Sequence, residues 1–174
     1  MGSMNQKRYS AVSLAYNKSL WILGGLNEEV SDSNNTRMLY GRQRNVLSSS
    51  EFILESGVST AGPDLPIPIA KSAICMINSS MSILVGGTTL GTTLDTYQTD
   101  QSWYYNHEIE KFTDGPKLKI GRLGHSVGQI TDSVTNEKTI IVVGGFSYNE
   151  SPRNLDSTEL LVNGKWEQGN IPND

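Results

Sequence analysis

The chain has 174 residues, of which 36% are hydrophobic and 18% are charged. A chain of this length and composition can bury one sizeable core, so we expect one cooperative folding unit and not a disordered chain. The formal net charge of −4 argues against nucleic acid or an anionic membrane as a partner, and no apolar run approaches the roughly 20 residues of a membrane-spanning helix.

Residues 1–6 have the character of an expression tag, and we expect them to be disordered. They carry neither the charged nor the apolar region of a signal peptide, and a second methionine, Met4, follows the first. Cys75 is the single cysteine, so no disulfide can form within the chain. This favours the cytoplasm over an extracellular location.

An apolar stretch that ends in two glycines occurs three times along the chain. The glycine doublets are Gly24 with Gly25, Gly86 with Gly87, and Gly144 with Gly145. Self-similarity with a period of tens of residues indicates a solenoid or a propeller. We therefore read the chain as three repeats, and we expect the glycines to permit close approach of neighbouring backbones.

Other strand patterns surround each doublet in a similar order. A basic residue, Arg8, Lys71 or Arg122, precedes a first strand, and a third strand follows the doublet at 49–54, around 102–105 and at 157–162. Segments at 61–66, 114–118 and 168–172 close the repeats, and Trp166 precedes the last of them. No window shows helical periodicity, so the sequence predicts an all-β chain with four strands in each repeat.

The chain resembles the kelch family at these residues. The shared features are the glycine doublet, a Ser/Thr-Glu pair in the third strand (Glu51 and Glu159), an aromatic residue and a Gly-Pro-like closing segment. The middle repeat has lost the glutamate, and Ser59 replaces the aromatic residue in the first repeat. The resemblance implies a partial kelch-type β-propeller with three four-stranded blades, at residues 7–66, 67–121 and 122–172.

Three blades cannot close a ring, because closed propellers have about four to eight. Each blade buries its faces only against its neighbours, so two apolar faces remain to be covered. We expect either further kelch blades in a longer parent protein or a second copy that completes a six-bladed ring.

The residue inventory offers no metal cluster, nucleophile motif or phosphate-binding loop, so we predict no catalytic residues, no metal, no cofactor and no enzymatic activity. His107 and His125 are the only histidines, and a structural hydrogen bond is the better interpretation of His125. Glu51 and Glu159 recur at equivalent positions, as an inter-strand contact would. The alternative is an extracellular or carbohydrate-related propeller of the galactose oxidase type. Its copper site would need a tyrosine linked to Cys75, whereas the apolar surroundings of Cys75 indicate a buried thiol.

Function is expected in the loops, which carry recognition on a rigid sheet scaffold. The resemblance implies one binding face, formed by residues 26–47, 88–101 and 146–156. Its candidate partner-binding residues are Arg37, Tyr40, Arg42, Arg44, Tyr148 and Arg153. Guanidinium groups suit capture of an acidic peptide, although Glu28, Glu29 and Asp32 could neutralise the arginines locally. The predicted role is a protein-interaction or scaffolding module, such as a substrate adaptor, that binds a protein or an acidic peptide.

Overall fold

The computed structural model describes residues 3–29, 43–90, 96–133 and 135–169. These residues form sixteen strands and no helix. The described part of the chain thus has no helix that is long and apolar enough to cross a membrane. Twelve of the strands form three four-stranded antiparallel sheets, which confirms the predicted all-β class and the four strands in each repeat. We call these sheets blades 1, 2 and 3.

The three blades have the same strand order along the chain. Blade 1 contains β1 (Val12–Tyr16), β2 (Ser19–Leu23), β5 (Ser50–Leu54) and β6 (Ser59–Ala61). Blade 2 contains β7 (Ala73–Met76), β8 (Met81–Val85), β11 (Ser102–Asn106) and β12 (Lys111–Asp114). Blade 3 contains β13 (Ser126–Thr131), β14 (Lys138–Val143), β15 (Thr158–Val162) and β16 (Lys165–Gly169). In each blade the strands are thus neighbours in sequence order.

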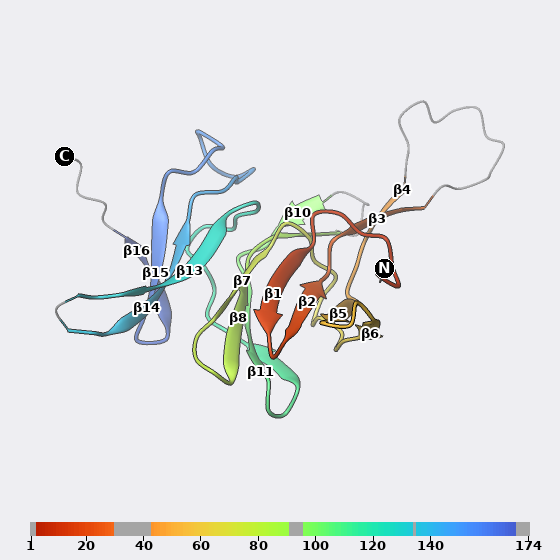
Figure 1. The fold of residues 1–174 in the computed structure, drawn as a ribbon. Coiled ribbons are helices and arrows are strands. Elements are labelled where there is room, and N and C mark those ends of the chain that lie inside the picture. The colour runs from red at the N-terminus through yellow and green to blue at the C-terminus, as the bar shows by residue number, and fades with distance from the viewer. Residues whose placement is uncertain (1–2, 30–42, 91–95, 134, 170–174) are drawn as a thin grey trace, which may run out of the picture.

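Two short hairpins extend from the connections between the second and third strands of blades 1 and 2. They are β3 (Leu26–Glu29) with β4 (Gln43–Val46), and β9 (Thr88–Leu90) with β10 (Thr96–Gln98). The sequence predicted plain loops at these places. The hairpins lie on the upper side of the molecule in Figure 1, as does the connection from β14 to β15.

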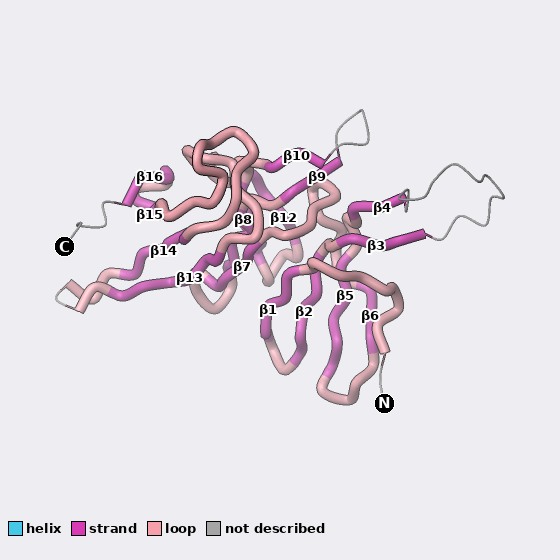
Figure 2. The backbone as a smooth tube through the Cα atoms, turned by 90° about the horizontal axis from the view of Figure 1, so that it is seen from above, coloured by secondary structure: helices cyan, strands magenta, loops and turns pink. Residues whose placement is uncertain are grey.

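The blades follow one another across the molecule, with blade 2 in the middle (Figure 2). The first strands lie together, because β7 contacts both β1 and β13. One apolar cluster fills the joint between blades 1 and 2, and its fully buried members include Trp21, Leu23 and Leu84. A second cluster, with Val85 and Trp166, fills the joint between blades 2 and 3. Most of the core therefore lies in two inter-blade joints, and a small third cluster joins Leu26 and Val46 of the β3–β4 hairpin to Ala70.

The glycine doublets are placed alike in the three blades. Gly24, Gly86 and Gly144 have φ angles of 59°, 57° and 64°, in the left-handed region where glycine is favoured. A Cβ at Gly24 would lie 2.2 Å from the carbonyl oxygen of Ile69, on the next blade. The first glycine therefore allows the next blade to approach closely.

A buried ion pair recurs in blades 1 and 3. Nη2 of Arg8 lies 2.6 Å from Oε1 of Glu51, and Nη2 of Arg122 lies 2.7 Å from Oε1 of Glu159. All four side chains are almost fully buried. Glu51 and Glu159 thus make a structural contact, as their repetition predicted, but their arginine partners lie in the segments ahead of β1 and β13 and not in strands.

Each ion pair also satisfies backbone groups. Nη1 of Arg122 donates to the carbonyl oxygen of Gly144 at 2.8 Å, and Oε2 of Glu159 accepts the backbone N–H of Lys119 at 2.7 Å. Arg8 and Glu51 make the matching bonds in blade 1, to Gly24 and from the N–H of Asn5. The ion pair therefore joins strand three, the glycine doublet and the segment that enters the blade.

Two expectations of strand register need correction. In each blade, the residue directly after the glycine doublet forms a β-bridge with a residue ahead of the first strand, and these bridges define equivalent positions. The residues directly before the bridged ones are Arg8, Ile69 and Arg122, which are therefore equivalent. Lys71 is therefore not the counterpart of Arg8 and Arg122, although its basic side chain suggested so. The fourth strands β6, β12 and β16 lie largely before the Gly-Pro-like segments, because Gly62 and Gly115 bond back to strand three and then lead the chain out of the sheet.

Candidate binding surface

The predicted partner-binding residues fall into two groups. Arg37, Tyr40 and Arg42 lie outside the described residues, and for Arg44 the structure gives only the backbone position in β4, opposite Glu28. Tyr148 and Arg153 are exposed on the connection from β14 to β15. The described part of the predicted surface is therefore the region around blades 2 and 3.

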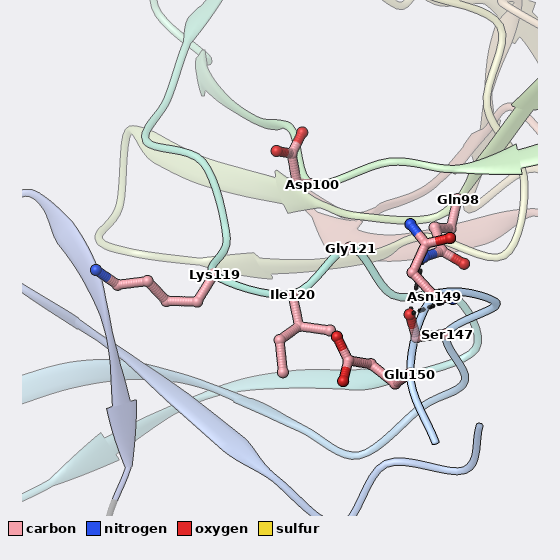
Figure 3. Close-up of a pocket in the computed structure, with 8 residues that line it drawn as sticks. All are labelled: Gln98, Asp100, Lys119, Ile120, Gly121, Ser147, Asn149 and Glu150. Carbon is pink, nitrogen blue, oxygen red and sulfur yellow. Dashed lines mark hydrogen bonds between the residues drawn. The ribbon is translucent and has the colours of Figure 1, made fainter. Parts of the chain in front are cut away.

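A pocket of about 370 Å³ opens between blades 2 and 3 on the loop side (Figure 3). Its walls come from β10 and the residues after it, from the link between the two blades, and from the β14–β15 connection. The lining residues are Gln98, Asp100, Lys119, Ile120, Gly121, Ser147, Asn149 and Glu150. Two of the three loops predicted to form the recognition face thus contribute to one pocket, together with the link between the blades.

Gln98 connects the two walls of this pocket. Its side-chain Nε2 donates to Oγ of Ser147 at 2.8 Å, and its Oε1 accepts the backbone N–H of Tyr148. Oγ of Ser147 also accepts the N–H of Asn149 at 3.3 Å. Ser147 is fully buried, so the β14–β15 connection is fixed against β10 rather than suspended in solvent.

The pocket is polar, with charges of both signs. Asp100 and Glu150 contribute carboxylates and Lys119 contributes an ammonium group. Lys119 lies 3.7 Å from Glu167, and both side chains are more than half exposed, so solvent screens this pair strongly. Such a lining offers both hydrogen-bond donors and acceptors, which suits the backbone or polar side chains of a peptide.

Two exposed tyrosines are next in sequence to residues of the pocket, although neither lines it. Tyr97 precedes Gln98 in β10 and is 50% exposed, and Tyr148 follows Ser147 and is 49% exposed. The ring of Tyr148 packs edge-on against Phe146, with ring centroids 5.0 Å apart. Tyrosine is enriched where interfaces gain most of their binding energy, because it combines a large apolar ring with a polar tip.

The remaining reactive side chains have structural surroundings. Nε2 of His125 lies 3.1 Å from the carbonyl oxygen of Val85, which only accepts, so Nε2 carries the proton. Burial lowers the pKa of His125 to about 4, helped by the charge of Arg122 and opposed by the bond to Val85. Cys75 packs in the joint between blades 2 and 3, and burial raises the pKa of its thiol to about 11. Both observations agree with the structural roles expected from the sequence.

His107 lies among aromatic rings at the other joint. Its ring stacks on Tyr16 with centroids 3.9 Å apart, and it meets Tyr105 edge-on. Burial lowers the pKa of His107. Within the described ranges, no three His, Cys, Asp or Glu side chains are grouped so that they could hold a metal ion.

Sequence reasoning located the loops but not the individual pocket residues. Gln98 and Asp100 fall in the loop predicted at 88–101, and Asn149 and Glu150 fall in the loop predicted at 146–156. Lys119 was missed, because it lies in the link between repeats. No motif in the sequence singled out this residue.

Comparison with known proteins supplies no residue whose role could be transferred to this chain. The sequence matches no family model, and no curated protein matches it significantly. Its function is therefore inferred from its own geometry.

Proposed function

We propose that the chain is a kelch-type partial β-propeller that acts as a non-catalytic protein-interaction module. The architectural support is the repetition of a four-stranded sheet with the same register and the same glycine conformation. The observation that carries the functional proposal is the pocket between blades 2 and 3, which is formed by two loops and by the link between the blades. The exposed Tyr97 and Tyr148 are next in sequence to its lining residues Gln98 and Ser147. A rigid sheet scaffold with a polar pocket and exposed aromatic rings is suited to bind a peptide segment of another protein.

The pocket indicates how such a segment would be held. An extended peptide carries alternating N–H and C=O groups, which the carboxylates of Asp100 and Glu150 and the ammonium group of Lys119 can satisfy. The tyrosine rings would cover apolar side chains of the segment. An acidic segment would in addition be attracted by Arg37, Arg42 and Arg44.

The pocket can be tested with a displayed library of random peptides as the probe. Peptides selected on the wild-type chain are titrated against the double variant Tyr97→Ala/Tyr148→Ala and against the control Ile109→Ala. Ile109 is 66% exposed and lies on the turn between β11 and β12, away from the pocket. We expect the double variant to weaken binding about tenfold or more and the control to leave it unchanged. Equal affinities of all three proteins would contradict the proposal.

The arginine contribution has a separate readout. Replacing Arg37, Arg42 and Arg44 with alanine should weaken binding of an acidic peptide, flatten its salt dependence and leave thermal stability almost unchanged. A titration at low and physiological salt measures both effects. Unchanged affinity at both salt concentrations would reject the arginines as anchors and leave the pocket as the binding site.

A further inference from the structure

The two joints within the chain are made by the same pair of backbone hydrogen bonds. In the first bond, the second glycine of a doublet donates to the next blade: Gly25 N–H to Ile69 C=O, and Gly87 N–H to Arg122 C=O, both at 2.8 Å. In the second bond, the next blade donates back. Lys71 N–H bonds to Ser10 C=O at 2.9 Å, and Gly124 N–H bonds to Lys71 C=O at 2.8 Å. Each joint thus uses one donor and one acceptor from either blade.

The two ends of the described chain hold the unused halves of this joint. Among the described residues, no partner accepts from Gly145 N–H or donates to Gly124 C=O at the end of blade 3. None donates to Arg8 C=O or accepts from Ser10 N–H at the start of blade 1. The two ends are therefore complementary. The N–H of Gly145 could donate to the C=O of Arg8, and the N–H of Ser10 could donate to the C=O of Gly124.

These groups are already held in the conformation of the internal joints. Gly145 has a φ of 98°, against 98° and 107° at Gly25 and Gly87. Ser10 has a φ of 53°, against 54° and 63° at Lys71 and Gly124. Ser10 and Lys71 adopt a left-handed conformation that is unfavourable for residues other than glycine, so the fold maintains it at the free end as well.

Apolar side chains at the two ends are also left exposed where the equivalent side chains of the internal joints are buried. Leu23 and Val85 directly precede their doublets and are fully buried by the next blade, whereas the equivalent Val143 is 44% exposed. On the opposite face, Leu20 of blade 1 is 41% exposed, whereas the equivalent Ser82 and Ile140 are buried. Figure 1 shows blades 1 and 3 on opposite sides of the molecule, with blade 2 between them.

We propose that two copies of this chain associate head to tail, so that the blade 3 end of each copy docks on the blade 1 end of the other. The occupant is a second copy because the chain carries both complementary halves of one joint, in backbone donors and acceptors and in apolar faces. Two such joints, related by a two-fold axis, would close six blades into a ring, which is within the range of closed propellers. This proposal concerns the end faces and does not depend on the pocket.

The proposal can be tested by measuring the mass of the wild-type chain by sedimentation over a series of dilutions. We expect twice the mass of the chain at the concentrated end and dissociation to one chain on dilution. A single chain at every concentration would overturn the proposal. A mass that keeps rising beyond two chains would show an open head-to-tail filament and overturn the closed ring.

Charge variants identify the surfaces that meet. Val143→Asp and Leu20→Lys each place a charge in both joints of a dimer, so each variant alone should sediment as one chain. An equal mixture should recover the dimer, because one joint is then unaltered and the other carries opposite charges. Ile109→Asp, on an exposed turn of the central blade, is the matched control and should remain dimeric. Dimers of both single variants, or no recovery in the mixture, would contradict head-to-tail docking.

Amide hydrogen exchange of the wild-type chain gives a measurement that needs no variant. The amides of Gly145 and Ser10 should be protected at high concentration and should exchange at least tenfold faster on dilution. The amides of Gly25 and Gly87, which are bonded within the chain, should not change. Equal exchange of Gly145 and Ser10 at both concentrations would show that these amides do not form joints.

Discussion

Blade 2 has apolar side chains at the two positions where blades 1 and 3 have a buried ion pair. Where the outer blades place Arg8 with Glu51 and Arg122 with Glu159, blade 2 has Ile69 and Trp103. Both residues belong to the apolar cluster of the joint between blades 1 and 2. The same backbone position therefore tolerates a buried ion pair or a buried apolar pair.

The exchange extends to the backbone donor that the glutamate satisfies. Glu159 accepts the N–H of Lys119, and Glu51 accepts the N–H of Asn5. The equivalent residue ahead of blade 2 is Pro66, which has no N–H. Blade 2 thus lacks both the carboxylate and one backbone N–H that would donate to it. The absence of the carboxylate therefore leaves no N–H without an acceptor at the position of Pro66.

The comparison shows what the ion pair contributes. An intact buried pair gains little over apolar residues of similar size, because removal of two charges from water offsets their attraction. Loss of one partner is costly, because the other charge remains buried. The pair in blades 1 and 3 is therefore weak evidence for extra stability but makes those blades sensitive to single substitutions.

The largest expected effect comes from breaking one pair. Glu159→Ala leaves Arg122 buried without its carboxylate and should lower the free energy of unfolding by about 3–5 kcal/mol. Chemical denaturation monitored by circular dichroism measures the change. A loss below about 1 kcal/mol would show that water reaches Arg122 and that the pair is not buried in solution.

His125 gives blade 3 a pH dependence that the other blades lack at this position, where Ser72 and Ala11 stand. Its folded-state pKa of about 4 lies below the ordinary 6.5, so the unfolded state binds the proton more readily. Stability is fully present above pH 6.5 and is lost as the pH falls towards 4. Between pH 7 and 5 we expect a loss of about 2 kcal/mol from this group.

The control for this prediction is His125→Gln, whose amide can still donate to Val85 but does not titrate. The difference between the two proteins in denaturation at pH 7 and 5 isolates His125. Glu51 titrates in a lower range: burial raises its pKa, but hydrogen bonds from Ser59, Arg8 and the N–H of Asn5 outweigh burial and bring the pKa below 4.5. An identical pH dependence of the two proteins between pH 7 and 5 would contradict the assignment.

The comparison can be tested further by placing the apolar pair of blade 2 at the equivalent positions of blade 3. The double variant Arg122→Ile/Glu159→Trp should lose less stability than Glu159→Ala, within about 2 kcal/mol of wild type, because no unpaired charge remains. Adding Lys119→Pro should recover part of this loss, since it removes the N–H that Glu159 satisfied. If the double variant is as unstable as Glu159→Ala, the apolar pair depends on neighbours that are present only in blade 2.

The smallest expected effect concerns the exposed pair of Lys119 and Glu167. Their charged atoms are 3.7 Å apart, and both side chains are more than half exposed. Glu167→Ala should change the free energy of unfolding by less than about 1 kcal/mol, and added salt should reduce even that change. It serves as the exposed counterpart of Glu159→Ala in the same denaturation series.

The sequence by itself determined the β class and the repeat, because alternating apolar runs and glycine doublets act locally on the backbone. The kelch resemblance implied one face for residues 26–47, 88–101 and 146–156, and the last two of these segments meet at the pocket. The sequence treated the β3–β4 and β9–β10 hairpins as plain loops. The equivalence of Ile69 with Arg8 and Arg122 could not be predicted from the sequence. Lys71 lies two residues after Ile69, and its basic side chain suggested that it was the equivalent residue. Equivalence in a sheet is set by hydrogen-bond pairing between strands and not by residue type.

Only the tertiary structure decided which side chains from different repeats meet. Gln98 and Ser147 are distant in sequence and form one pocket because two blades pack side by side. The exposure of Val143 beside the burial of Leu23 and Val85 likewise depends on the presence or absence of a following blade. Local sequence sets the strands, but contacts between blades depend on how apolar faces stack, and identical local patterns can be buried or exposed accordingly.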